Sequence, residues 1–342
     1  MLTGEQRNIS NDSVKKPKAL ALLSGGLDST LAVKIITGQA VDVEAVNFVT
    51  PFCLGNTTCS IERLEDLGVK VHRVFLGEEF LNLVVNPPHG HGSQMNPCID
   101  CRILMLKKAK ELAEKIGADF LVTGEVLDER PFSQRMQTLM LIEKKAGVEG
   151  RVLRPLSARL LPETEPEKRG IVKRESLLAI RGRRRLPQIE LARKTGIKDY
   201  PNPSGGCLLT DPRFAQRLGE HLRYKKELTF EDVALLRVGR HFRLGTVKVI
   251  VGRNREENDR LLATAKGCGI PYLEANDYVG PVTLYIGEER KELIEKAAAI
   301  TLRYSDAPKD AKGKVTYKDE NGGTLEIITV SAKDEELEKL RI

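Results

Sequence analysis

The 342-residue chain contains no tryptophan, and aromatic residues account for only 5% of it. Proteins that bind single-stranded nucleic acid along its bases rely on several aromatic side chains on which the bases stack. With so few such platforms, this mode of binding is disfavoured. If the chain binds a nucleic acid, contacts to phosphates and recognition by shape fit the composition better.

Long apolar runs are also missing. Nowhere do about 18 apolar residues follow one another, as a membrane-spanning helix requires, and the first residues do not resemble a secretion signal. We therefore expect a cytoplasmic protein without membrane contact. The 41% apolar content suffices for a large core, and the length predicts two or three domains.

Cysteine is too sparse for a disulfide framework, and a cytoplasmic chain keeps most of its thiols reduced; the six cysteines stand at positions 53, 59, 98, 101, 207 and 268. Five residues separate Cys53 from Cys59, which is not a recognised ligand spacing. Cys268 stands among small residues near the end of a predicted helix. We expect ordinary structural roles for these three, and the other three are considered below.

The whole chain has a net charge of +7, and acidic residues are scarce in one stretch of it. From residue 168 to 185, Glu175 is the only acid among eight basic residues, which are Lys168, Arg169, Lys173, Arg174, Arg181, Arg183, Arg184 and Arg185. This density favours a nucleic acid bound through its phosphates, with a solvated helix face as the alternative.

The order of apolar segments predicts an α/β protein. A short apolar run at 19–23 ends in a Gly-rich loop and is followed by helical spacing from 29 to 36, and further strands are expected at 41–49, 69–75 and 120–122. Strands alternating with helices indicate a doubly wound parallel sheet, whose ligand site lies at the carboxyl ends of the strands. A smaller α+β domain is expected to follow. The expected parts are a loose arm (1–17), the sheet domain (18–155), a helical basic extension (156–225), the α+β domain (228–310) and a charged segment (311–342).

The loop after the first strand reads Ser24-Gly25-Gly26-Leu27-Asp28-Ser29. Glycines allow close approach of the backbone to phosphate, and the hydroxyls and free amides at a helix start bind the anion. The loop matches neither the kinase-type phosphate loop nor the dinucleotide fingerprint. It resembles the signature of the PP-loop ATP pyrophosphatases, with an adenine nucleotide hydrolase-like fold. The resemblance implies that ATP adenylates a carbonyl oxygen and releases pyrophosphate.

Further residues are expected around the bound ATP. Asp28 would repel the phosphates unless Mg²⁺ lies between them, so we predict that Mg²⁺ enters with the nucleotide. Asn47-Phe48 and Thr123-Gly124 follow later strands of the sheet and are predicted to bracket the adenine and ribose. For Phe48 a place in the core is an equal alternative.

Two cysteines, Cys98 and Cys101, fall in the first turns of a predicted helix, with Asn96 as its N-cap and Pro97 at its first position. A helix amino end favours thiolates. A lone Cys-x-x-Cys suits a redox pair, zinc or an iron-sulfur cluster equally well. Cys207, in the Gly-rich loop 203–208, is the third partner we predict. His89 and His91 lie in a loop expected to act as a lid.

These two cysteine motifs and segment 18–215 as a whole resemble the PP-loop tRNA thiolases, which make 2-thiouridine or 4-thiouridine. The resemblance implies tRNA as the partner and Cys101 and Cys207 as a catalytic pair together with Asp28. The additional Cys98 resembles the cluster-dependent thiolases, in which three thiolates hold a [4Fe-4S] cluster. The rival mechanism is a persulfide on Cys207 that Cys101 releases. The sequence does not decide whether the sulfur donor is sulfide or a persulfide carrier. It also does not decide whether the protein is a homodimer.

Residues 228–310 resemble the NFACT-R type RNA-binding domain in short motifs at 238–242, 251–254 and 304–305. The resemblance implies phosphate contacts from Arg237, Arg240, Arg243 and Arg253, with surface charge as the alternative. A tRNA sulfurtransferase is thus predicted. Two other hypotheses are a PP-loop amidotransferase or ligase that uses ammonia, and a non-catalytic RNA-binding adaptor.

Overall fold

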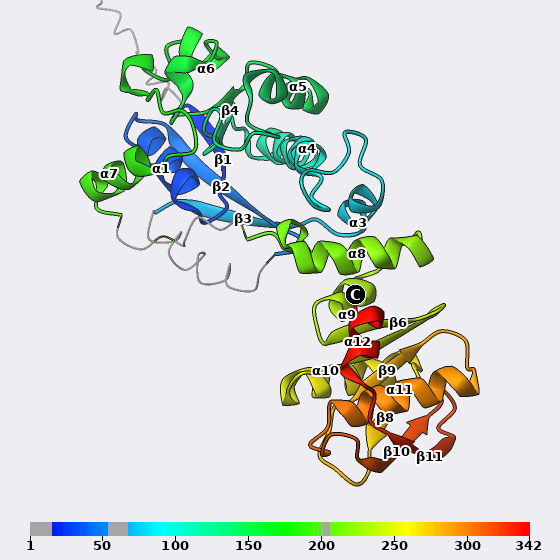
Figure 1. The fold of residues 1–342 in the computed structure, drawn as a ribbon. Helices are drawn as coiled ribbons and strands as arrows, with labels where there is room; N and C mark the ends of the chain where they lie inside the picture. Colours follow the sequence, from blue (N-terminus) through cyan, green and yellow to red (C-terminus); the bar gives the residue numbers. More distant parts are fainter. Residues whose placement is uncertain (1–15, 54–67, 198–199, 201–205) are drawn as a thin grey trace, which may run out of the picture. The chain divides into compact units, whose positions relative to one another are not determined.

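The computed structural model describes residues 16–53, 68–197, 200 and 206–342. The chain divides into two compact units. The first consists of Met1–Leu83, Pro87–Gly92 and Pro97–Gly206, and the second of Val84–Asn86, Ser93–Asn96 and Cys207–Ile342. Figure 1 traces both. None of the described helices is long and apolar enough to cross a membrane.

A parallel sheet forms the centre of the first unit. Its five strands lie in the order β3-β2-β1-β4-β5, and all the pairs are parallel. The bounds are β1 (Lys18–Leu22), β2 (Asp42–Val49), β3 (Lys70–Phe75), β4 (Phe120–Thr123) and β5 (Val152–Leu153). All four residues of β4 are buried, as expected for a strand covered on both faces. The predicted parallel α/β sheet is confirmed.

Helices cover both faces because alternate residues of a strand point to opposite sides. Ala19 and Ala21 of β1 pack in one cluster with α1 (Leu27–Thr37). Leu20 and Leu22 pack on the other face, in a cluster with α4 (Cys98–Ile116) and α5 (Met136–Ala146). The sheet is therefore doubly wound, with α1 opposite α4 and α5 (Figure 1).

Most of the predicted basic extension (156–225) belongs to the same unit as the sheet, whereas its last part, from Cys207 on, belongs to the second unit. The elements of the larger part are a 3₁₀ turn (Ala158–Leu160), α6 (Glu165–Lys168), a second 3₁₀ turn (Arg174–Ser176) and α7 (Leu186–Thr195); α3 (Glu78–Val85) lies earlier in the chain. Ala192 of α7 packs against Leu27 and Leu31 of α1. Before α7, the Gly182 amide donates to the Leu127 carbonyl at 2.8 Å. The extension is therefore attached to the loop that follows β4.

The second unit is built on an antiparallel sheet of six strands in the order β11-β10-β8-β9-β7-β6. Its strands are β6 (Arg240–Leu244), β7 (Val247–Val251), β8 (Tyr272–Ala275), β9 (Thr283–Ile286), β10 (Lys312–Lys318) and β11 (Thr324–Val330). Its helices are the 3₁₀ turn Leu208–Thr210, α8 (Pro212–Tyr224), α9 (Phe230–Leu236), α10 (Arg255–Cys268), α11 (Lys291–Arg303) and α12 (Asp334–Leu340).

The expected boundary at residue 310 differs from this division. The charged segment 311–342 supplies β10, β11 and α12, and Val315 and Tyr317 of β10 are core residues of the second unit. In β10 the apolar residues alternate with lysines and threonine, so the segment looks polar in sequence. The apolar side chains form a buried face only because β10 pairs with β8 and β11.

Two lysines and a histidine surround Glu44 at the amino end of the parallel sheet. Lys18 donates from Nζ to Oε1 at 2.8 Å, and Nε2 of His72 lies 2.6 Å from Oε2. Lys70 Nζ is 3.5 Å from Oε2. These contacts, first that of Lys18 and then that of His72, lower the pKa of Glu44 from its ordinary value of 4.5 to about 2. Glu44 therefore links β1, β2 and β3 by charge.

Replacing Glu44 by Gln is expected to lower the free energy of unfolding by about 1–2 kcal/mol at pH 6. A carboxyl whose pKa is depressed in the folded state stabilises above its unfolded pKa, and this contribution is lost as pH falls. The difference between E44Q and the unmodified protein should thus hold above pH 4.5 and shrink toward pH 2. Urea unfolding across this range measures it. E114Q, at an exposed position, is the control, and a difference that stays constant down to pH 3 would contradict the assignment.

Candidate functional site

The predicted phosphate loop lies at the carboxyl end of β1 and leads directly into α1. Gly25 has a φ of 78°, which a residue with a side chain rarely adopts. Gly26 is the N-cap, and no side chain caps the helix. The Ser24 and Ser29 hydroxyls are 3.2 Å apart, and the Ser29 hydroxyl donates to the Gly26 carbonyl at 2.9 Å. An uncapped helix start beside two hydroxyls suits an anion.

Asp28 is the charged residue of this loop, and Arg185 lies against it. Nη2 of Arg185 is 3.3 Å from Oδ2 of Asp28, and Nε is 3.9 Å from Oε1 of Glu129. Burial raises the pKa of both carboxyls, and the charge of Asp28 raises the pKa of Glu129 further. The positive charges of Arg185 and Arg130 act in the opposite direction and lower both pKa values. The sequence pattern pointed to Asp28 alone. Glu129 and Arg185 lie beside Asp28 only because the chain folds in this way.

Thr123 and Gly124 lie beside the phosphate loop. A Cβ on Gly124 would stand 2.6 Å from the carbonyl carbon of Asp28 and closer still to the Ser29 backbone. Only glycine permits this approach. The buried Thr123 hydroxyl donates to Glu125 at 3.1 Å. The bracketing of ribose by these residues stays a prediction, while their contact with the loop is a finding.

A buried ion network supports the strand end that carries Thr123. Arg154, which is 2% exposed, donates from Nε to Glu125 at 3.0 Å and also pairs with Glu143. Burial by itself would raise the pKa of Glu125, but the charges of Arg154 and Arg102 hold it below its usual value. Glu125 is therefore an ionised, fixed acceptor directly after Gly124. Sequence patterns gave no sign of this network, because its members come from three separate elements.

Asn47 and Phe48 at the end of β2 make contacts within the protein. The Asn47 amide donates to the Leu23 carbonyl at 2.8 Å, which holds the start of the phosphate loop against β2. Phe48 packs against the cluster under α4. Their predicted contact with adenine stays a prediction.

Cys98 and Cys101 begin α4, and both are half-buried. The N-cap is Pro97 rather than Asn96, whose side chain instead accepts a bond from the Gln94 amide at 3.0 Å. Asp100, which lies between the two cysteines in sequence, is 4% exposed. Its Oδ2 accepts a hydrogen bond from the His89 backbone amide at 2.9 Å, and its Oδ1 lies 2.6 Å from Nδ1 of His89. The loop expected to be a lid is thus tied to the cysteine helix.

Cys207 belongs to the second unit, and residues 203–205 of its predicted motif lie outside the described residues. Cys98 and Cys101 come from one helix start, and two thiols spaced in this way can serve as ligands of an iron-sulfur cluster. Within the described ranges, no group of three or more His, Cys, Asp or Glu side chains is placed to hold a metal ion. The three-cysteine site stays a prediction. Cys53 accepts from the Thr50 amide at 3.3 Å, and Cys268 is exposed.

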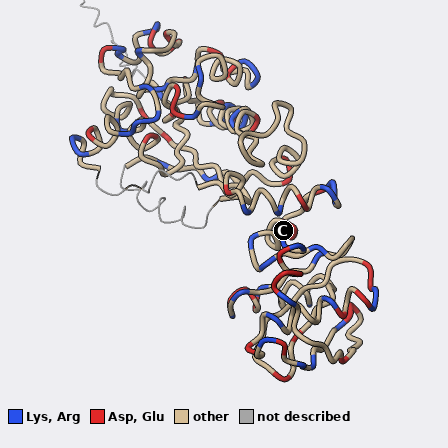
Figure 2. Tube along the Cα trace, in the orientation of Figure 1, with Lys and Arg blue, Asp and Glu red and all other residues tan. Residues whose placement is uncertain are grey.

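Basic residues of the extension differ in their contacts. Arg174 pairs with Glu167, and Arg181 donates to Asp128 at 2.6 Å. Arg183 and Arg184 are exposed. Arg183 also lines a cavity of about 500 Å³ together with Arg135 of the loop after β4. Figure 2 shows lysine and arginine positions, in blue, along the chain around both α6 and α7.

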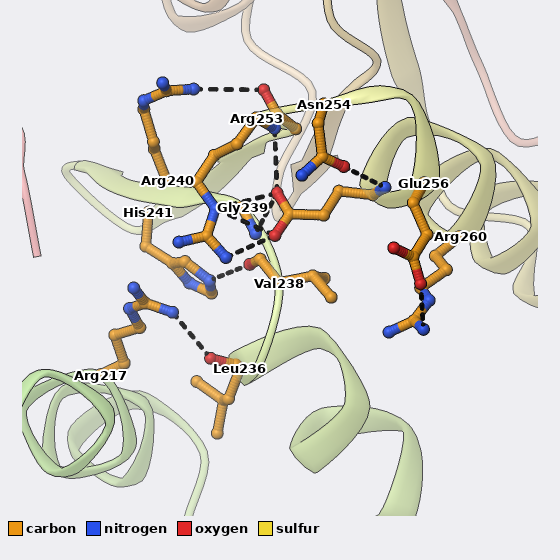
Figure 3. A network of polar contacts seen from close by, with 12 residues as sticks. Arg217, Leu236, Val238, Gly239, Arg240, His241, Arg253, Asn254, Glu256 and Arg260 are labelled. Atoms are coloured by element: carbon orange, nitrogen blue, oxygen red, sulfur yellow. Dashed lines mark hydrogen bonds and ion pairs between the residues drawn. The ribbon is translucent and has the colours of Figure 1, made fainter. Parts of the chain in front are cut away.

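Partners inside the second unit contact three arginines that were predicted to bind RNA, namely Arg240, Arg243 and Arg253. Arg240 donates to the Gly252 carbonyl at 3.3 Å and lies over the Tyr304 ring. Arg253 pairs with Glu257, which also accepts from the Gly239 amide at 3.2 Å (Figure 3). Arg243 contacts Glu220 at 2.5 Å and lies over Tyr224. The two contacts of Arg240 connect the three motifs to one another. Contact of these arginines with RNA stays a prediction.

Comparison with known proteins assigns both units. Residues 14–159 match the family model described as thiamine biosynthesis protein (ThiI), and residues 239–341 match the NFACT protein RNA binding domain. The chain joins a ThiI-family domain to an NFACT RNA-binding domain. The ThiI-family domain contains the phosphate loop and the Cys-x-x-Cys helix, and the NFACT match includes β10, β11 and α12.

Several curated proteins match part of the chain. A tRNA-specific 2-thiouridylase MnmA of Syntrophotalea carbinolica is 34% identical over 32% of this chain and 35% of its own. A probable tRNA sulfurtransferase of Thermococcus kodakarensis is 25% identical over 41% of this chain and 36% of its own. The chain thus spans about a third of the length of these relatives. A solved structure of the U34-tRNA thiolase NcsA from Methanococcus maripaludis with its [4Fe-4S] cluster has 18% identity and a TM-score of 0.34, covering 66% of this chain and 75% of that one.

Replacing Gly124 by Ala is expected to disturb the phosphate loop directly, because the new Cβ would overlap the backbone of Asp28 and Ser29. We expect ATP affinity to fall by tenfold or more, as a rough estimate, and stability by about 1–3 kcal/mol. Nucleotide titration and thermal unfolding measure the two effects. G38A is the control, since its Cβ would stand 3.5 Å from its nearest neighbour. Unchanged ATP affinity in folded G124A would show that nucleotide binding does not depend on this contact.

Proposed function

We propose that the protein is an ATP-dependent tRNA sulfurtransferase, which adenylates a uridine carbonyl and replaces its oxygen with sulfur. The observation that carries the proposal is the pairing, within one ThiI-family domain, of an uncapped Gly-rich helix start with a Cys-x-x-Cys helix. The first element suits the phosphates of ATP. The second suits sulfur chemistry.

The phosphate loop would perform the activation step. The Ser24 and Ser29 hydroxyls and the amides at the start of α1 hold the pyrophosphate portion of ATP. Mg²⁺ beside Asp28 offsets the repulsion between the carboxylate and the phosphates. The uridine oxygen attacks the α-phosphate, the bond to the β-phosphate breaks, and pyrophosphate departs. The base then carries AMP as a leaving group.

Sulfur would be delivered from the cysteines. Cys98, Cys101 and Cys207 would hold a [4Fe-4S] cluster, which supplies an open iron able to carry sulfide when it is bound. The half-buried Cys98 and Cys101 thiols at the helix start suit this role. In the rival form, a persulfide on Cys207 attacks the activated base and Cys101 closes a disulfide with Cys207. Both routes expel AMP, and the persulfide route then needs a thiol reductant before the next turnover.

The RNA partner is supported by the match of residues 239–341 to an RNA-binding domain. The exposed Arg183 and Arg184 of the first unit add positive charge to the segment that precedes α7. Such residues would contact phosphates and would make RNA binding weaken as salt concentration rises.

Asp28→Asn is expected to lower RNA-dependent release of AMP by about 100-fold, because the carboxylate that would bind Mg²⁺ is lost. The test uses protein purified without oxygen, tRNA, ATP and sulfide, with AMP and thionucleoside measured separately. Absence of RNA-dependent AMP release from the unmodified protein would contradict the sulfurtransferase and favour a binding adaptor.

The same preparations separate the two sulfur routes. With a cluster, Cys98→Ser should lose iron, thionucleoside formation and the sulfur-dependent release of AMP, but keep the RNA-dependent release of pyrophosphate. The exposed Cys268→Ser is the matched control and should lose none of these. An iron-free protein that works with a persulfide donor and tolerates Cys98→Ser would eliminate the cluster route.

A further inference from the structure

Arg185 lies between two carboxylates at the phosphate loop. Its guanidinium is 3.3 Å from Oδ2 of Asp28 and 3.9 Å from Oε1 of Glu129. All three side chains are mostly buried, with exposed fractions of 18% for Arg185, 20% for Asp28 and 16% for Glu129. Two acids from separate loops thus share one cation, at the sheet edge where the nucleotide is proposed to bind.

The contacts in this group are incomplete. Asp28 Oδ1 and Arg185 Nε are buried and have no hydrogen-bond partner among the described residues. Gln188, one turn later on α7, is fully buried and lies near enough to Asp28 to help lower its pKa. Neither of its polar atoms completes a hydrogen bond of good geometry. Buried polar groups without partners are rare, so a concentration of them indicates a place for a ligand.

Arg185 is held firmly enough to act at a defined position. It is the N-cap residue of α7, and that helix packs on α1 through Ala192, Leu27 and Leu31. The preceding residues are attached to the loop after β4 by the Gly182 amide and by the ion pair of Arg181 with Asp128. The backbone at Arg185 is therefore fixed on both sides, while the long side chain keeps rotational freedom.

The charges explain why the guanidinium would move. Asp28, Glu129 and Arg185 together carry one net negative charge. A divalent cation binds carboxylate oxygens and would compete with the guanidinium for the same two acids. Arginine in turn pairs with phosphate in a bidentate manner. Entry of a metal together with phosphates would thus give each group a stronger partner.

We propose that Arg185 exchanges partners when Mg²⁺ and ATP bind: Mg²⁺ takes the Asp28 and Glu129 carboxylates, and the released guanidinium binds the phosphates of the nucleotide. Arg185 occupies the place of the metal in the empty site and is a phosphate ligand in the filled one. Glu129 becomes a second carboxylate for Mg²⁺. This inference rests on the proposed use of ATP but not on the later sulfur chemistry.

The test compares R185Q with R184Q, whose arginine is the exposed neighbour. Mn²⁺ stands in for Mg²⁺, and its binding without nucleotide is followed by electron paramagnetic resonance. Binding of α,β-methylene ATP, which cannot be cleaved at the reacting bond, is measured with Mg²⁺ in excess. R185Q should bind Mn²⁺ about threefold to tenfold more tightly because the competing cation is gone. It should bind the analogue about 10- to 100-fold more weakly.

The opposite signs of these two changes identify the exchange. R184Q should change either affinity by less than about twofold. R185K keeps the charge without the planar fork, and should weaken the analogue while leaving Mn²⁺ binding almost unchanged. Thermal unfolding of each variant establishes that it is folded.

Two results would overturn the inference alone: unchanged analogue affinity in R185Q, or weaker binding of both Mn²⁺ and the analogue, which marks a structural ion pair. If R185Q does not fold, R185K decides by the same two measurements. Failure of the unmodified protein to bind the analogue would instead contradict the proposed use of ATP, and the exchange with it.

Discussion

The close approach of the Gly124 backbone to the first turn of α1 is the constraint on which the site depends. It sets the end of β4 directly against Asp28 and Ser29, so the phosphate loop has a neighbouring wall only because residue 124 has no side chain. The loop after β4 then begins at this point and carries Glu129 toward Asp28. The ion pairs of Arg154 with Glu125 and Glu143 hold the end of β4 in place. They bury three charged groups, and this burial is favourable only while every partner is present.

The site combines firm backbone positions with side chains that are not fully bonded. The strands and helices around the phosphate loop are closely packed, yet Asp28, Arg185 and Gln188 carry buried polar atoms that find no partner in the described part of the chain. Such atoms are costly in a folded protein unless a ligand completes them. This explains how a stable α/β domain can hold a charged group ready to change partners. In the second unit, by contrast, Arg243, Arg253 and Arg240 are bonded to Glu220, Glu257 and a backbone carbonyl, respectively.

Several features were predictable because they depend on neighbours in sequence. The strand, loop and helix from residue 18 to 37 follow from an apolar run, glycines and helical spacing, and the structure confirms the parallel sheet. The Cys-x-x-Cys pair at a helix start is equally local, although the helix begins at Cys98 rather than one residue earlier. The segment 311–342 appeared as a charged tail because the alternation of lysine and apolar residues in β10 gains meaning only from the strands beside it.

The sequence by itself determined the phosphate loop, the cysteine spacing and the two domain families, since each is a contiguous pattern with its own chemistry. Only the tertiary structure decided which residues from distant parts of the chain contact them. Arg185 meets Asp28 across 157 positions of chain, and the meeting depends on α7 packing against α1. The tie between His89 and Asp100 likewise depends on a loop folding back over α4. Charges that are distant in sequence acquire partners through packing, and the local pattern does not encode which partners those will be.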